Sequence, residues 1–164
     1  MDSQDADALE SRPPSPEDLI KLCDSLNRQE AKYLIVGGFA VIQQGLYRTT
    51  EDIDVLLESS MENQRRVRKA MECLPDRAIR DVLENDLNEF TVVRVADEFV
   101  VDLMLSACGV DYEGAKDEIE WHELRGVRIP FASARLLLRL KQTYREKDAL
   151  DRQFLTEKLK KGAK

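Results

Sequence analysis

The segment Asp52–Leu57 carries two aspartates one residue apart in an otherwise apolar run. Side chains in a β-strand point alternately to opposite faces, so Asp52 and Asp54 share one face, about 7 Å apart along the chain. The intervening apolar residues can then enter a core on the other face. Two like charges this close repel each other unless the face is solvated or a cation lies between them. The segment therefore predicts a strand with one buried face and one face that favours cations.

A third carboxylate, Asp102, lies inside the apolar run Phe99–Leu105. A carboxylate in such a strand costs free energy unless it has a partner. If this strand pairs so that Asp102 lies beside Asp52 and Asp54, three hard oxygen ligands converge. Such ligands suit Mg²⁺ or Mn²⁺, with water and phosphate oxygens in the remaining positions. The alternatives are a chance D-x-D pattern and an Asp102 that is satisfied by arginine or by backbone N–H groups.

Two glycines, Gly37 and Gly38, join a short apolar run at 33–36 to a segment with helical spacing at 39–44. Backbone N–H groups at the start of a helix can face an anion. Glycine also lets phosphate oxygens approach without a Cβ in the way. The same pair of glycines fits an ordinary tight turn equally well.

Periodic patterns over the rest of the chain predict an α+β fold. Ser15-Pro16 is typical of a helix start, with a capping serine and a proline at the first helical position. We expect a two-residue turn, Ala96-Asp97, to join two neighbouring strands. The order indicates a small mixed β-sheet with helices, followed by C-terminal helices. The expected strands are 33–36, 52–57, 89–95, 98–105 and one near 127–129; the expected helices are 15 to about 27 or 29, 39–44, 62–74, 133–144 and 148–160.

The domain organisation follows from length and composition. Residues 1–14 are polar without a periodic apolar pattern, so we expect a disordered tail. A chain of 164 residues is too short for two comfortable domains, so 15–164 are expected to be one. Within it we expect a core at about 31–131 and a helical lobe at about 132–161.

The net charge of −7 is unevenly divided. Residues 121–164 carry 12 Lys and Arg against 5 Asp and Glu, whereas the remaining residues carry 13 against 27. A polyanionic ligand would meet the C-terminal quarter, or would need metal ions to approach the acidic part. Attraction between the two parts within the fold explains the asymmetry equally well. A pI near 4.9 argues against a general nucleic-acid binder.

Several protein classes are disfavoured by composition. No apolar run approaches the roughly 20 residues that span a bilayer, and the acidic N-terminus lacks the apolar segment of a signal peptide. We therefore expect a cytoplasmic protein without membrane association. The scattered Cys23, Cys73 and Cys108 fit reduced, buried thiols. Because His122 is the single histidine of the sequence, a zinc site or a histidine-based catalytic triad is disfavoured.

The combined motifs resemble a known signature. Val36-Gly37-Gly38-Phe39-Ala40, then 11 residues, then Asp52-Ile53-Asp54-Val55, with Asp102 on a later strand, resembles that of the DNA polymerase β-like nucleotidyltransferase superfamily. The resemblance implies that the first two acids bind metal ions and that the glycines contact a triphosphate. It implies that Asp102 completes the metal site and helps to activate the attacking hydroxyl. One departure is Phe39, which follows two glycines where a hydroxyl residue could have contacted the γ-phosphate.

Two further blocks narrow the resemblance. Arg48–Asp54 is similar to the R-x-T-x-D-I-D block of stand-alone bacterial nucleotidyltransferases, including toxin-type enzymes of abortive-infection systems. Residues 141–151 are similar to their K-x3-R-x-K-D-x2-D element. The resemblance implies nucleotide contacts from Arg48, Thr49 and Lys141, with Asp148 orienting the basic groups. The alternative for the second block is a solvated, salt-bridged helix.

These observations predict a metal-dependent enzyme that transfers a nucleotide from a nucleoside triphosphate to an acceptor hydroxyl. The acceptor stays open between tRNA, a protein and a small molecule. The alternative is a catalytically silent module that binds a nucleotide or a partner, and an antitoxin partner is a further possibility. The expected catalytic and metal-binding residues are Asp52, Asp54 and Asp102, and the expected nucleotide-binding residues are Gly37, Gly38, Arg48, Thr49, Lys141 and Asp148.

Overall fold

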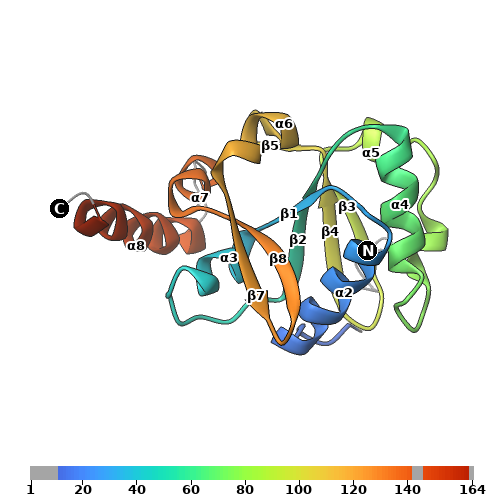
Figure 1. Cartoon of the computed structure of the whole chain (residues 1–164), viewed down its shortest axis with the longest axis horizontal. Coiled ribbons are helices and arrows are strands. Elements are labelled where there is room, and N and C mark those ends of the chain that lie inside the picture. The colour runs from blue at the N-terminus through green and yellow to red at the C-terminus, as the bar shows by residue number, and fades with distance from the viewer. Residues whose placement is uncertain (1–10, 142–145, 163–164) are drawn as a thin grey trace.

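A six-stranded mixed β-sheet in the order β3-β4-β2-β1-β8-β7 runs through the middle of the protein (Figure 1). The computed structural model describes residues 11–141 and 146–162. Strand β2 pairs in parallel with β4 and antiparallel with β1, β1 pairs in parallel with β8, and the outer strands β3 and β7 are antiparallel to their neighbours. The strands of this sheet are β1 (Tyr33–Val36), β2 (Asp52–Leu57), β3 (Val93–Ala96), β4 (Val100–Met104), β7 (Ile119–Leu124) and β8 (Val127–Ala132). The expected α+β class with a small mixed sheet is confirmed.

Helices surround this sheet, and a short hairpin forms a separate two-stranded sheet. Helices α2 and α4 pack against each other, whereas α3 lies against β1, β2 and α7. Helix α8 packs on α7 and then extends away from the sheet to the C-terminus (Figure 1). The helices are α2 (Pro16–Arg28), α3 (Gly37–Gln43), α4 (Met61–Met71), α5 (Asp86–Glu89), α6 (Tyr112–Ala115), α7 (Ala134–Leu140) and α8 (Glu146–Gly162), with 3₁₀ turns at Ala78–Asp81 and Lys116–Glu118; the hairpin is β5 (Ser106–Ala107) with β6 (Val110–Asp111). None of the helices in the described part of the chain is long and apolar enough to cross a lipid bilayer.

The N-terminal helix begins where its capping residues predict. Ser15 accepts a hydrogen bond from the backbone N–H of Asp18, and the Asp18 carboxylate accepts one from the backbone of Ser15. Arg12 adds a two-pronged ion pair with Asp18, and its backbone N–H donates to the Glu98 carbonyl. Arg12, which falls within the expected tail of residues 1–14, is therefore held by the body of the domain. Residues 1–10 lie outside the described residues.

The β3–β4 connection differs from the expected two-residue turn. It spans three residues, Asp97–Phe99, and the first strand starts at Val93. The cause is Asp97, whose buried carboxylate accepts backbone hydrogen bonds from Asp76, Ala78 and Glu98. Lengthening the turn by one residue changes which side chains lie opposite each other across the hairpin.

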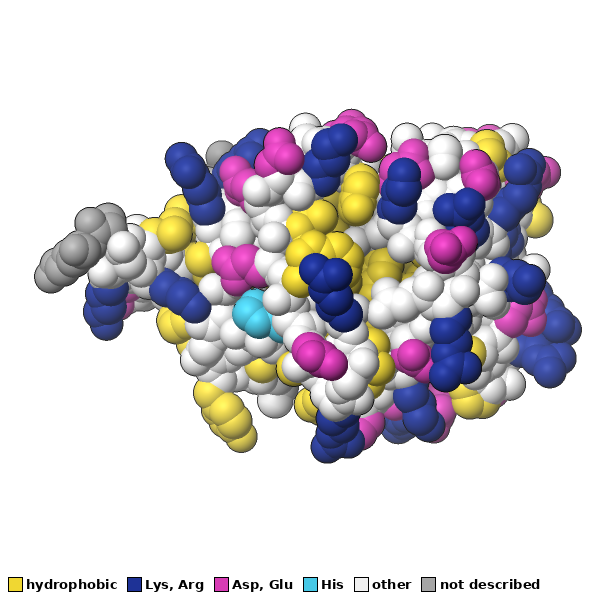
Figure 2. All heavy atoms as spheres, in the orientation of Figure 1, with side chains coloured by type: hydrophobic (Ala, Val, Ile, Leu, Met, Phe, Trp, Pro, Cys, Tyr) yellow, Lys and Arg dark blue, Asp and Glu magenta, His cyan; other side chains and the backbone are white. Residues whose placement is uncertain are grey.

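Strand β7, two of the cysteines and the end of α7 also differ from what the sequence predicts. The sequence did not predict strand β7. This edge strand is half-exposed and carries charged residues, so it lacks the apolar pattern of a buried strand. Cys23 is buried as expected, whereas Cys73 and Cys108 are exposed. The expected helix 133–144 is α7, which ends at Leu140, and residues 142–144 lie outside the described residues. On the face shown in Figure 2, charged side chains of both signs surround hydrophobic side chains near the middle of the molecule.

Candidate active site

Three carboxylates meet on one face of the sheet, at the pairing of β2 with β4. Asp54 lies directly opposite Asp102 in the parallel register, and Asp52 is two residues away on the same face of β2. One oxygen from each of the three lies within 4.8 Å of the others. Asp102 is buried, with 5% of the residue exposed, whereas Asp52 and Asp54 are partly exposed. The pairing of the two strands thus brings together the three predicted acids.

Gly37 is required by the position of Asp54. Gly37 has a left-handed backbone, with φ of +69°, and a Cβ added there would collide with Oδ2 of Asp54. Gly38 also lies against the segment that leads into β2, since a Cβ on it would come to 2.5 Å from Oγ1 of Thr50. The two glycines therefore let the start of α3 pack directly against the residues that hold the acids.

A buried ion network forms a second wall of the site. The Lys141 Nζ lies 3.1 Å from Oδ1 of Asp148 and 3.2 Å from Oδ2 of Asp151. Asp151 also accepts a hydrogen bond of 2.6 Å from Nη1 of Arg48. Asp148 and Asp151 are 0% and 1% exposed, so these carboxylates depend on their basic partners. The network ties α8 to the loop between α3 and β2. Arg145, which belongs to the same sequence block, lies outside the described residues.

The two walls face a single open cleft of about 1270 Å³. Its lining includes the three aspartates, both glycines, Arg48, Thr49, Lys141 and Arg94. Asp148 does not line the cleft, because it is buried behind Lys141. Tyr47 is fully exposed at the cleft, where it offers an aromatic ring to a ligand.

Arg94 is a site residue that the sequence patterns did not indicate. It projects from β3 and lies opposite Asp102, to which it donates two hydrogen bonds of 3.0 Å, from Nε to Oδ1 and from Nη2 to Oδ2. Its Nη2 is also 3.6 Å from Oδ2 of Asp52. The hydrogen bonds to Asp102, opposed by desolvation and supported by the charges of the acids, raise the pKa of Arg94. The sequence patterns did not indicate Arg94 because they predict a two-residue turn, which would pair Arg94 with Phe99. The three-residue turn pairs it with Asp102 instead.

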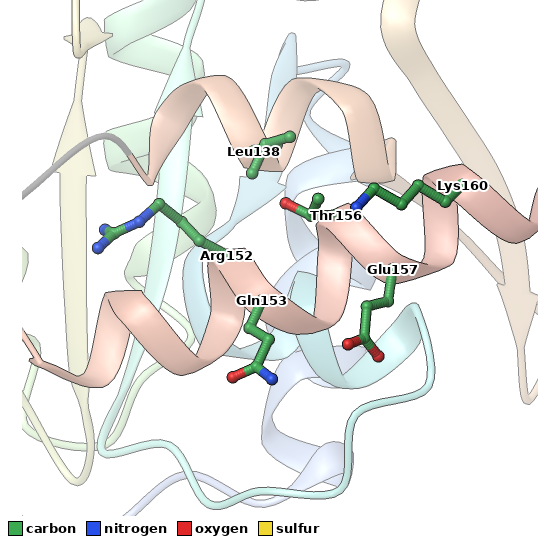
Figure 3. A pocket seen from close by; sticks show the side chains of 6 residues that line it. All are labelled: Leu138, Arg152, Gln153, Thr156, Glu157 and Lys160. Carbon is green, nitrogen blue, oxygen red and sulfur yellow. The ribbon is translucent and has the colours of Figure 1, made fainter.

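A second hollow, of about 470 Å³, lies along α7 and α8 (Figure 3). Its lining includes Arg152 and Lys160 beside Leu138, and Figure 3 shows Gln153 and Glu157 pointing away from Leu138. The guanidinium of Arg152 is already hydrogen-bonded within the protein, because its Nη1 donates a hydrogen bond of 2.7 Å to the Lys141 carbonyl. This hollow does not contain the three clustered aspartates, so the larger cleft is the candidate active site.

Comparisons with known proteins identify the architecture that carries this cleft. The chain matches no protein-family model and no curated protein sequence. Among solved structures, the lincosamide antibiotic adenylyltransferase LnuA in its lincomycin-bound form gives a TM-score of 0.57 at 17% identity, covering 88% of this chain and 98% of that one. A Thermotoga maritima protein described as a nucleotidyltransferase gives a TM-score of 0.48 at 18% identity, covering 90% of this chain and 91% of that one. The chain has a nucleotidyltransferase fold.

The residues at the cleft fit a divalent metal ion. Three carboxylates can each supply one oxygen to a common point. Oxygen ligands of this kind are the preferred donors for Mg²⁺ and Mn²⁺, and within the part of the chain that the structure describes no histidine or cysteine joins the cluster. Mutual repulsion of the three carboxylates also makes a cation favourable at this point.

Proposed function

We propose that the protein transfers a nucleoside monophosphate from a nucleoside triphosphate to an acceptor hydroxyl, with release of pyrophosphate. The observation that carries this proposal is the pairing of Asp54 with Asp102, beside Asp52, at a cleft of a nucleotidyltransferase fold. In the reaction, the acceptor oxygen forms a bond to the α-phosphorus as the bond from that phosphorus to the β-phosphate oxygen breaks. Pyrophosphate leaves with the bonding electrons, and the hydroxyl proton passes to a base or to water.

The three aspartates would hold the divalent ions, Mg²⁺ or Mn²⁺. Bound ions of this kind supply positive charge to the attacking and leaving oxygens. The protein's own contribution is to hold the carboxylates at one point, which Gly37 permits by lacking a Cβ. Asp102 is the buried member, so its oxygens are the least hydrated of the three and the most restricted in orientation.

Arg48 and Lys141 are the residues proposed to meet the triphosphate. Both line the cleft, and both are held by the same carboxylate of Asp151. A cation already fixed by a buried partner loses little conformational entropy when it binds a phosphate. Asp148, behind Lys141, would act by orienting its ammonium group. Gly37 and Gly38 would offer backbone N–H groups, and exposed Thr49 a hydroxyl, to the same cleft.

The acceptor belongs to one of three classes: tRNA, a protein or a small hydroxyl compound. The structural neighbour LnuA is a lincosamide antibiotic adenylyltransferase, which makes a small molecule a reasonable first acceptor to test. The basic C-terminal residues provide only modest support for RNA. One of them, Lys158, already donates a hydrogen bond of 2.6 Å to the Gln44 carbonyl.

The first experiment is isothermal titration with ATP, CTP, GTP and UTP, each with and without Mn²⁺. We expect at least one of them to bind only with the metal. The double variant Asp52→Asn/Asp54→Asn should lose this binding, whereas Asp24→Asn, a partly exposed aspartate on α2, should retain it. If no triphosphate binds the folded wild-type protein, or if the double variant binds normally, the proposal is wrong.

Transfer is then measured with α-labelled triphosphates and a cell lysate whose RNA, protein and small-molecule fractions are counted separately. A labelled fraction supports the enzyme and names the acceptor class. Saturable binding without transfer to any fraction supports the silent binding module instead. A role as the toxin of a toxin–antitoxin pair further predicts growth arrest on expression alone, relieved by a neighbouring small open reading frame.

A further inference from the structure

Arg94 brings a positive charge to the point where the three carboxylates converge. Its guanidinium holds both oxygens of Asp102 and lies 3.6 Å from Asp52. It comes from β3, the outermost strand on that side of the sheet, and 39% of its side chain is exposed. Because it also lines the cleft, Arg94 can interact with a ligand while still paired with Asp102.

The effect of this charge depends on what is bound. A bare divalent ion is attracted by three carboxylates and repelled by Arg94. A metal–nucleoside triphosphate complex carries a net negative charge and would be attracted by the same guanidinium. Arg94 therefore acts in opposite directions on the two forms in which metal can arrive.

We propose that Arg94 makes the site discriminate against the bare ion and favour metal that arrives on the triphosphate. In this role Arg94 is a positioning residue for Asp102 and a selectivity residue for the metal complex. The inference rests on the proposed function, since it concerns the order in which metal and nucleotide enter the same cleft.

The hydrogen-bond geometry is compatible with this role. Each carboxylate oxygen has two acceptor sites, so Asp102 can accept from Arg94 with one and bind a metal ion with the other. A planar, two-pronged pair also restricts the rotation of the carboxylate. Asp102 is thereby kept in position when the metal is absent, at the cost of weaker attraction for a bare ion.

The test is to measure two affinities for Arg94→Gln. The first is for Mn²⁺ alone, from the electron paramagnetic resonance signal of the free ion. The second is for Mn²⁺ with an α,β-methylene nucleoside triphosphate, which cannot be cleaved at the reacting bond. The analogue carries the base of the triphosphate that binds best in the titrations above. We expect about tenfold tighter binding of bare Mn²⁺ and about tenfold weaker binding of the complex.

Two further variants separate charge from structure. Arg80→Gln removes an arginine whose Nε and Nη2 both contact the Glu72 carboxylate and which does not line the cleft, so neither affinity should change. Arg94→Lys keeps the charge and loses the fork, so the ratio of the two affinities should stay within about threefold of the wild-type ratio, whatever common change in both follows from the lost fork.

Changes in the same direction for both ligands, or no change in either, would overturn the proposal and leave Arg94 a purely structural partner of Asp102. If Arg94→Gln does not fold, as judged by circular dichroism, Arg94→Lys decides: a change in the ratio of the two affinities well beyond threefold contradicts a role based on charge. Failure of the proposed function is distinguishable, because the complex would then either not bind the wild-type protein or bind it without any transfer from an α-labelled triphosphate, whatever the two affinities of Arg94→Gln.

Discussion

Replacement of Gly37 by alanine separates a backbone effect from an effect on the metal site. With φ of +69°, an alanine at this position costs about 1–2 kcal/mol in backbone strain. The new Cβ would also occupy the place of Oδ2 of Asp54, so the carboxylate must rotate or shift. The added Cβ would also lie 2.9 Å from the Cβ of Asp54, which rotation of the carboxylate does not move, so Gly37→Ala should lose more stability than backbone strain alone explains. Loss of one of three metal ligands should weaken Mn²⁺ binding by at least about tenfold.

Gly126 provides the matched control. It has a φ of +82° in the turn between β7 and β8, and a Cβ added there would meet no atom within 4 Å. Gly126→Ala should therefore lose only the backbone strain of about 1–2 kcal/mol in urea denaturation and bind Mn²⁺ like the wild type. The two variants are compared by urea denaturation and by Mn²⁺ titration. Equal Mn²⁺ affinities in Gly37→Ala and Gly126→Ala would refute the reasoning, because the collision with Asp54 would then have no consequence for the site.

Three more predictions concern charge and stability. The hydrogen bonds from Arg12 lower the pKa of Asp18 to about 2, so the stabilisation by this carboxylate is complete above its ordinary pKa near 3.8 and is lost as the pH falls toward 2. Asp18→Asn should lower the free energy of unfolding at pH 7 by about 1–2 kcal/mol and weaken its dependence on pH between 4 and 2, measured by urea denaturation across that range. Lys141→Met leaves two buried carboxylates without their shared ammonium and should lower the free energy of unfolding by about 3–5 kcal/mol, whereas Lys116→Met, at an exposed pair, should have little effect in the same assay. Mn²⁺ at ten times its dissociation constant should stabilise the protein by about 1.4 kcal/mol, and chelation by EDTA should reverse the rise in melting temperature; no rise would show that the acids do not bind the ion.

The parts of the site that could be predicted are those with a local pattern. In β2, the alternation of polar and apolar residues and both acids of the D-x-D lie within six residues. Strands β1 and β2 have the bounds that the sequence predicts. Asp102 stands out because a charge in an apolar strand needs an explanation. Each of these signals can be read in a short window of the chain.

The parts that could not be predicted depend on contacts between distant segments. Arg48 and Asp151 are 103 residues apart, and no periodicity links them. Arg94 depends on the turn length between β3 and β4, which is set by the buried Asp97 through hydrogen bonds to residues about 20 positions away. The tertiary environment of one aspartate thus decides which side chain faces Asp102.

The register of β2 and β4 explains how the protein tolerates three like charges at one point. Ile53, Val101 and Leu103 alternate with the acids and are 0%, 0% and 1% exposed. Burying three such side chains contributes about 5–9 kcal/mol, and a slip of one residue in either strand would turn its apolar residues out of the core. Three carboxylates make three pairs, and repulsion at about 4 Å is about 1–4 kcal/mol for each pair at the effective dielectric constants of a partly exposed site; the guanidinium of Arg94 offsets part of it. Core packing together with the charge of Arg94 therefore balances the repulsion without metal, so loss of the ion should lower the melting temperature without unfolding the protein.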